Sequence, residues 1–170
     1  MTNLYPNPGW RAKRKRKGTA GIRASEYHSG VDFSIDVDIA AAPDRVWAVM
    51  SDIGKWHEWT PSVRSITRRD QGPLRPGSQA WIRQPKFPPA FWTVTEVGDR
   101  SFTWVSRAPG MMVTARHYVT PVGDGSRATL SLNFAGLLGP FFGRLTRDIN
   151  NRYLAMEAAG LKRRSEESQM

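Results

Sequence analysis

The clearest signal in this chain lies in residues 35–61, IDVDIAAAPDRVWAVMSDIGKWHEWTP. The stretch opens on a strand in which apolar and polar residues alternate with a period of two, which is typical of a sheet buried on one face. Pro43 then suits the first turn of a short helix, where a missing N–H costs little. A second helical turn carries Trp56 and Trp59. Together with Trp47 they need a large apolar volume, which either a core or a ligand cavity supplies.

Size and composition predict a single domain of a cytoplasmic protein. A chain of 170 residues can bury a sizeable core. It contains no cysteine, which excludes disulfides, thiolate metal sites and cysteine nucleophiles. No apolar run approaches the roughly 20 residues that span a membrane. The segment after the basic N-terminus also lacks the apolar stretch of a secretory signal.

The positive charge is concentrated near the N-terminus. The formal net charge is +10, and residues 1–30 hold seven Lys or Arg against one acid. The run Arg11–Lys17, RAKRKRK, lies among Pro and Gly and cannot bury apolar surface. We expect a disordered tail over 1–30, a folded domain over 31–165 and a disordered end over 166–170. The tail is a solvated extension, the remnant of a mis-assigned start codon, or a tether in weak contact with an anionic membrane or nucleic acid.

After the helical pair the sequence predicts a series of antiparallel strands, because short turns rich in Gly, Pro and Asp separate them. They are expected at residues 63–69, 78–84, 91–97, 101–107, 112–120 and 127–134. Alternation places Phe102, Trp104 and Ser106 on the inner face of one strand. On the next strand it turns His117 inward.

The C-terminal segment predicts one long helix that begins at Gly139-Pro140 and runs to about Lys162. Its apolar side chains fall within an arc of roughly 120°; they are Phe141, Phe142, Leu145, Ile149, Tyr153 and Met156. Arg152 falls inside the same arc. Taken together, the elements predict an α+β domain. A curved antiparallel sheet of six or seven strands grips a long C-terminal helix, and two short helices plug one end.

Four segments carry a resemblance to a known family: APDRVWAVMSDIGKWHEWTPSV, PGSQAWIRQP, SFTWVSRAPG and GLLGPFFGRLTRDINNRYLAMEAAGLKRR. In this order, over roughly residues 31–165, the chain resembles the polyketide cyclase/dehydrase branch of the START-like (SRPBCC) superfamily. The resemblance implies the helix-grip or Bet v 1-like fold, with a deep cavity between sheet and helix that binds an apolar small molecule. Related proteins carry lipids or plant hormones, or cyclise and dehydrate polyketide chains. Because one fold hosts many activities, binding and catalysis both stay open.

The candidate ligand contacts combine aromatic side chains with a few polar ones. They are Trp56, Trp59, Arg83, Trp92, Trp104, Ser106, Phe134, Phe141, Leu145, Ile149, Arg152 and Tyr153. The aromatic members either form core or line a cavity, since ligand pockets are mostly apolar. Trp56 and Trp59 at the mouth, and Trp104 in the middle of the sheet, are the expected cavity wall.

Two arginines have open roles. Either Arg83 or Gln84 faces the cavity rim, and alternation alone does not decide between them; Arg83 is otherwise solvated. Arg152 falls in an apolar arc, where a guanidinium needs partners. It either extends to the rim, forms a structural ion pair, or anchors an anionic or carbonyl-bearing ligand.

His117 is the only histidine expected to face inward. It is either a hydrogen-bonded core residue or a pocket contact and general acid/base, because an imidazole titrates near neutral pH. No second ligand lies at metal-binding spacing, and no nucleotide or hydrolase motif is present, so neither a metal nor a cofactor is expected. No carboxylate is expected inside the cavity, which argues against paired-acid hydrolysis.

Three functions follow in order of preference. The first is a non-catalytic binder or carrier of a hydrophobic small molecule. The second is a polyketide cyclase or dehydratase with His117 as acid/base and an arginine polarising a carbonyl, since folding a reactive chain is largely orientation. The third is an adaptor that uses its basic tail. A monomer and a homodimer both fit the sequence.

Overall fold

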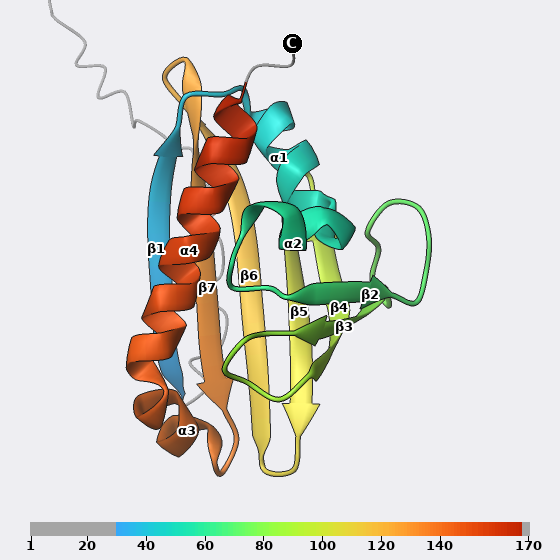
Figure 1. The fold of residues 1–170 in the computed structure, drawn as a ribbon, viewed down its shortest axis with the longest axis vertical. Helices are drawn as coiled ribbons and strands as arrows, with labels where there is room; N and C mark the ends of the chain where they lie inside the picture. Colours follow the sequence, from blue (N-terminus) through green and yellow to red (C-terminus); the bar gives the residue numbers. More distant parts are fainter. Residues whose placement is uncertain (1–29, 168–170) are drawn as a thin grey trace, which may run out of the picture.

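The computed structural model describes residues 30–167. A seven-stranded antiparallel sheet curves around the C-terminal helix, which confirms the predicted α+β helix-grip architecture (Figure 1). The predictions for residues 1–29 and 168–170, the run Arg11–Lys17 included, lie outside the described residues.

The strands are β1 (Val31–Ile39), β2 (Ser65–Arg68), β3 (Gln79–Arg83), β4 (Ala90–Gly98), β5 (Ser101–Ala108), β6 (Met111–Val122) and β7 (Gly125–Ala135). Their order across the sheet is β1-β7-β6-β5-β4-β3-β2, so the first strand pairs with the last one. The ends of β2 to β7 lie within about two residues of their predicted positions, because the turn residues that separate the strands stop them locally.

The alternation in β1 sorts its residues as predicted. Phe33 packs inward, and the aspartates line the outer face. Across the strand pair, Asp38 accepts hydrogen bonds from the Arg127 guanidinium at 2.7 and 3.0 Å, and Asp36 accepts one from the Thr129 hydroxyl at 2.6 Å. The Arg127 bond holds the pKa of the Asp38 carboxyl below its usual range. Polar cross-strand pairs on one face and apolar ones on the other thus fix the register.

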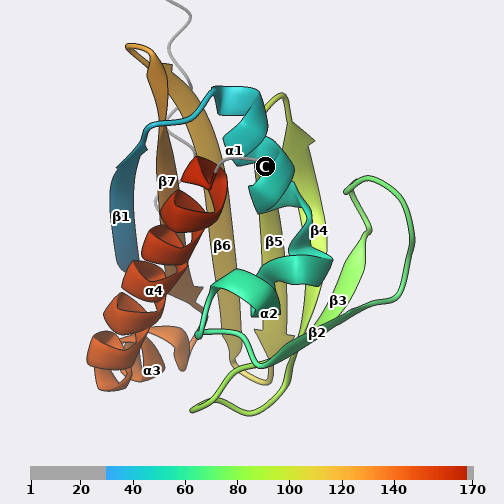
Figure 2. The ribbon, with the colours of Figure 1, turned by 45° about the horizontal axis from the view of Figure 1, so that its top comes forward.

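The helices lie on the concave side of the sheet. They are α1 (Pro43–Ser51), the short 3-10 turn Ile53–Lys55, α2 (Trp56–Trp59), α3 (Gly139–Leu145) and α4 (Arg147–Glu166). Figure 1 and Figure 2 show α4 running along the sheet, with α1 toward the end opposite α3 and α2 between the two ends. No helix in the described part of the chain is long and apolar enough to cross a membrane.

The predicted single C-terminal helix is wrong, because the helix is broken at Thr146. The Thr146 hydroxyl donates to the Phe142 carbonyl oxygen at 2.7 Å and accepts from the Asn150 amide at 2.9 Å. A hydroxyl that bonds to the carbonyl four residues back bends a helix. The break turns α3 relative to α4, so one apolar arc cannot describe both. Arg152 is exposed instead of falling in a buried arc.

Helix α4 buries a stripe of its own, which includes Leu154, Ala158 and Leu161. The helix runs one residue past the predicted domain end at 165. There Glu166 accepts the N–H of Ala40 at 2.7 Å and pairs with Lys162 at 2.6 Å, and these bonds hold its pKa below the usual range. The top of α4 is therefore bonded to the chain just after β1.

Both C-terminal helices make their closest approaches through glycine. A Cβ at Gly160 of α4 would collide with the carbonyl oxygen of Trp59. A Cβ at Gly143 of α3 would lie 3.0 Å from Val31 Cβ and 3.1 Å from Phe134 Cβ. In α3 the side that meets the sheet is thus glycine, and the large side chains point elsewhere.

Candidate functional site

An aromatic cluster fills the space between α2, α4 and the middle of the sheet. Its members, with their exposed fractions, are Trp56 2%, Trp59 4%, Phe102 1%, Trp104 3% and His117 3%. The ring centroid of Trp56 lies 5.3 Å from those of both Trp104 and His117, and 5.6 Å from that of Trp59. Side chains so little exposed are packed against one another, so the centre of the grip is closed.

His117 lies inside, as alternation along β6 predicts. Its ring stacks on Phe102 with centroids 4.4 Å apart and planes 5° from parallel. Its Nε2 lies 3.0 Å from Oε1 of Glu157, whose side chain is 14% exposed. The expectation that no carboxylate reaches the interior is therefore wrong. Glu157 lies on α4, one turn from the buried Leu154 and Leu161. The apolar arc that we predicted for one continuous helix did not include this side of α4, so Glu157 was not expected inside.

Two ring nitrogens of the cluster have no hydrogen-bond partner among the described residues. They are Nε1 of Trp104 and Nδ1 of His117, whereas Nε1 of Trp56 donates to the Met50 carbonyl at 2.9 Å. In the tautomer with the hydrogen on Nε2, that nitrogen donates to Glu157 and Nδ1 keeps a lone pair. In this tautomer the interior offers one donor, Trp104 Nε1, and one acceptor, His117 Nδ1, on rings whose centroids lie 5.9 Å apart.

Leaving such groups unpaired costs about 1–3 kcal/mol each. Buried polar groups in folded proteins nearly always have a partner, so an exception calls for a reason such as a ligand or water. A polar group that reached both nitrogens would supply the missing partners.

Tyr153 of α4 contacts the connection between β3 and β4. Its hydroxyl accepts the N–H of Lys86 at 3.0 Å, and its ring meets that of Phe87 edge-on at 5.7 Å. Figure 1 shows this connection reaching across the sheet toward α4. Trp92 and Ser106 are half-buried cross-strand neighbours on the inner face of β4 and β5.

The other predicted contacts divide by burial. Buried are Trp56, Trp59, Trp104, Phe134 and Tyr153; half-buried are Trp92, Ser106 and Ile149; exposed are Arg83, Phe141, Leu145 and Arg152. Trp56 and Trp59 do not border a mouth, because α4 and the sheet cover them. Arg83 is exposed on β3 while its neighbour Ile82 is buried, which places the arginine on the outer face.

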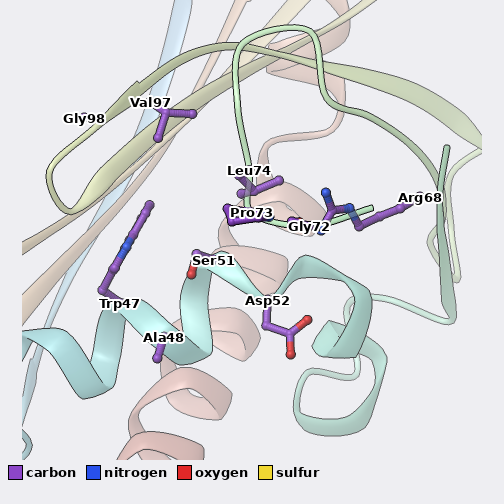
Figure 3. Close-up of a pocket in the computed structure, with 10 residues that line it drawn as sticks. All are labelled: Trp47, Ala48, Ser51, Asp52, Arg68, Gly72, Pro73, Leu74, Val97 and Gly98. Carbon is purple, nitrogen blue, oxygen red and sulfur yellow. Dashed lines mark hydrogen bonds between the residues drawn. The ribbon is translucent and has the colours of Figure 1, made fainter. Parts of the chain in front are cut away.

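An open cleft of about 510 Å³ lies beside α1 and was not expected from the sequence. Figure 3 shows Trp47 at one end and Arg68 at the other. It is lined by Trp47, Ala48, Ser51, Asp52, Arg68, Gly72, Pro73, Leu74, Val97 and Gly98. These residues come from three separate segments, and no local sequence pattern predicts that the segments lie together.

The charges around this cleft are already paired. The Arg68 guanidinium donates to the Gly72 carbonyl at 2.8 Å and to Asp70 at 3.2 Å, and Asp52 pairs with Lys55 at 3.0 Å. The Ser78 hydroxyl, 2.6 Å from Asp70, is the main reason that the pKa of this carboxyl lies below its usual range. The two terminal nitrogens of Arg68 are thus paired, whereas its buried Nε has no hydrogen-bond partner among the described residues.

Within residues 30–167, no group of three or more His, Asp or Glu side chains is placed to hold a metal ion. His117 and Glu157 therefore form a pair without a third ligand. An isolated histidine–carboxylate pair inside an aromatic cluster suits hydrogen bonding and proton transfer.

Residues 30–166 match the family described as polyketide cyclase / dehydrase and lipid transport. The chain belongs to this family. No curated protein matches the chain closely enough to count as a relative.

Solved structures show the same fold at low identity. A START superfamily protein from Mycobacterium smegmatis aligns with a TM-score of 0.62 at 16% identity, covering 78% of this chain and 97% of its own. A point mutant of norcoclaurine synthase from Thalictrum flavum, in complex with a transition-state analogue, gives 0.63 at 18%, covering 81% and 96%. The di-domain ARO/CYC protein StfQ of the steffimycin biosynthetic pathway gives 0.65 at 14%, covering 81% of this chain and 51% of its own.

Proposed function

We propose that this protein binds a small apolar molecule in the interior between the sheet and α4. The ligand is a lipid, polyketide or aromatic metabolite that carries a hydroxyl or carbonyl group. One observation carries the proposal: Trp104 Nε1 and His117 Nδ1 are buried in an otherwise apolar cluster and have no partner within residues 30–167. A ligand hydroxyl can accept from the indole N–H and donate to the imidazole lone pair.

The comparisons support the fold's capacity for such a ligand. The norcoclaurine synthase mutant was solved with a transition-state analogue, and StfQ belongs to a biosynthetic pathway. Their identities to this chain lie under 25%, so they speak for the architecture and not for the ligand.

Because the cluster is closed, binding requires an opening. We place it at the connection between β3 and β4, where one backbone hydrogen bond and one ring contact to Tyr153 join the connection to α4. Few bonds need to break there, compared with the many that join neighbouring strands. Half-buried Trp92 and Ser106 would then line the way in.

Isothermal titration with 2-naphthol and 2-methylnaphthalene tests this proposal. Trp104→Phe keeps an aromatic ring but replaces the indole with a smaller phenyl group and removes the N–H. Both probes lose the same packing, so it should weaken 2-naphthol binding about ten-fold more than 2-methylnaphthalene binding. Trp81→Phe on the exposed side of β3 is the matched control. Equal affinity of the wild type for both probes, or no binding of either, would contradict the proposal.

A second candidate function is cyclase-type catalysis, and the contact of 3.0 Å between His117 and Glu157 favours it. The carboxylate orients the imidazole, whose Nδ1 takes a proton from a methylene between two carbonyls. The resulting enolate carbon attacks a third carbonyl further along the chain, and the imidazolium protonates the new alkoxide. The arginine expected to polarise a carbonyl is absent from the described interior, since Arg83 and Arg152 are exposed. Trp104 Nε1 takes that place.

Turnover of a synthetic poly-β-ketone thioester tests the catalytic candidate. His117→Ala should abolish cyclisation above the background rate, and Glu157→Gln should lower it by a smaller factor, with a shifted pH profile. Unchanged turnover in His117→Ala would leave binding alone as the function. The cytoplasmic location, the oligomeric state and a tail that contacts membrane or nucleic acid stay predictions.

A further inference from the structure

The end of the molecule around α3 exposes a set of large apolar side chains, which we call the α3 patch. Its members, with their exposed fractions, are Leu137 90%, Leu138 42%, Phe141 61%, Phe142 38% and Leu145 69%. Isolated exposed apolar residues are ordinary, whereas a contiguous group marks an interaction surface. These five lie within nine consecutive residues.

The patch is exposed because glycine takes the inward positions. Gly139 and Gly143 are buried, and a Cβ on Gly143 would press on Val31 and Phe134. The Leu138 N–H donates to the Gly110 carbonyl at 2.8 Å, which ties the start of the patch to the turn between β5 and β6. The outward aromatic rings are thus held in place by a close backbone contact. Figure 1 shows α3 at the same end of the molecule as that turn.

The charges close to the patch in sequence are mostly positive, with Arg144 and Arg147 against one exposed acid, Asp148 in the first turn of α4. A shallow hollow of about 550 Å³ is lined by Arg144 together with Leu137, Pro140, Phe141 and Leu145. Arg144 and Arg147 are exposed, and residues 125–147 contain no Asp or Glu. An apolar surface with a cationic rim is complementary to a partner that is apolar inside and anionic at its boundary.

A second copy of this chain fits the patch poorly. Stable protein interfaces use about 20–30 residues a side, many more than the patch offers. In a two-fold pairing the same surface meets itself, so both copies would bring their arginines to one boundary. Like charges at such a boundary oppose association.

We propose that the α3 patch docks the protein onto the surface of an anionic lipid bilayer. Phe141, Leu145 and Leu137 enter the boundary between head groups and acyl chains, while Arg144 and Arg147 meet lipid phosphates. This goes beyond the proposed function and does not depend on which ligand the interior holds. It also differs from a tether through the basic N-terminal run, because the apolar side chains of α3 must leave water.

The chain contains no cysteine, so a single introduced one can be labelled cleanly. The full chain carrying Leu137→Cys with an environment-sensitive NBD label is mixed with vesicles of equal parts phosphatidylcholine and phosphatidylglycerol. The emission should rise severalfold and shift to the blue. Asp124→Cys is the matched control, because the turn between β6 and β7 lies at the opposite end of these strands, and its label should not respond.

Substitutions test the same surface without a label. In vesicle sedimentation, Phe141→Ser with Leu145→Ser should lower affinity about ten-fold or more, and Arg144→Glu should lower it only on anionic vesicles. Val122→Ser, 42% exposed at the far end of β6, should leave affinity unchanged. An unresponsive label at position 137, or vesicle binding that survives the double substitution, would overturn the proposal. A dimer in sedimentation velocity that the double substitution dissolves would replace the bilayer with a second copy.

Discussion

Helices α3 and α4 follow one another in sequence and use their apolar residues in opposite ways. Helix α4 turns Leu154, Leu161 and Glu157 toward the sheet and closes the interior around His117. Helix α3 turns glycine toward the sheet and leaves Phe141 in water. Both helices are apolar on one side. The contrast shows that an apolar helix face packs against the sheet only where the sheet leaves room for its side chains. Where the two backbones approach closely, glycine faces the sheet and the large apolar side chains point away from the core.

The strongest test of the closed interior is Trp56→Ala. Trp56 contacts the other members of the aromatic cluster, and its removal should cost about 3–5 kcal/mol of unfolding free energy, because the surroundings cannot collapse into a hole of that size. Urea denaturation measures it. Trp81→Ala, on the exposed side of β3, should cost far less. Equal losses for the two would mean that the interior is not packed as we describe.

The glycine contacts differ between the two helices in a way that substitution can measure. Gly160→Ala places a methyl group against the rigid carbonyl of Trp59 and should destabilise by about 2–3 kcal/mol, despite the better helix propensity of alanine. Gly143→Ala meets side-chain carbons at 3.0 to 3.3 Å, which can shift, so its net cost should be smaller. Thermal unfolding of both variants ranks them, and a reversed ranking would contradict the contact at Trp59.

The next largest loss of stability is expected from the buried pair of His117 and Glu157. Glu157→Leu leaves Nε2 of His117 without a partner and should cost about 1–3 kcal/mol. The double variant Glu157→Leu/His117→Phe removes both polar groups and should recover part of the loss. A double variant that is no more stable than Glu157→Leu alone would show that the pair contributes by packing only. Chemical denaturation at neutral pH is sufficient.

Outside the interior, stability should respond to acid through Asp70. Its pKa is held below the ordinary value of 3.8, mainly by the Ser78 hydroxyl and then by Arg68. A carboxyl with a lowered pKa in the folded state stabilises the protein fully above its ordinary pKa, and that contribution is lost as pH falls through the lowered value.

Ser78→Ala should therefore cost about 1 kcal/mol at neutral pH, and the difference from wild type should shrink below pH about 4. Melting temperatures from pH 2 to pH 7 measure this, with Ser131→Ala on β7 as control. A difference that is constant over the whole range would rule out the Asp70 bond as its origin.

The smallest effect is expected at the α3 patch. Leu145→Ser should change the free energy of unfolding by no more than about 0.5 kcal/mol, because the side chain is already in water. A large loss would show that the patch belongs to the core and would remove the contrast between the two helices. Guanidinium denaturation of Leu145→Ser beside Leu154→Ser makes the comparison direct.

The strands were predictable from sequence because the signals are local. Alternation in β1 and β6 has a period of two, and it placed Phe33 and His117 inward without knowledge of the rest of the chain. The site was predictable only in part. Glu157 was missed because the break at Thr146 changes the helical phase, and at that break the Thr146 hydroxyl bonds to the Phe142 carbonyl. The cleft at Trp47 was missed because three segments that are far apart in sequence build it.

The sequence by itself determined the order of the elements, the inner and outer faces of the strands and the family, since all of these rest on short-range patterns and on composition. Tertiary structure alone decided that Trp56 and Trp59 are packed at the centre, that Glu157 meets His117 and that the large side chains of α3 face water. The physical reason is that burial and pairing depend on which helix surface packs against the sheet. A single glycine or threonine in a helix can change that surface.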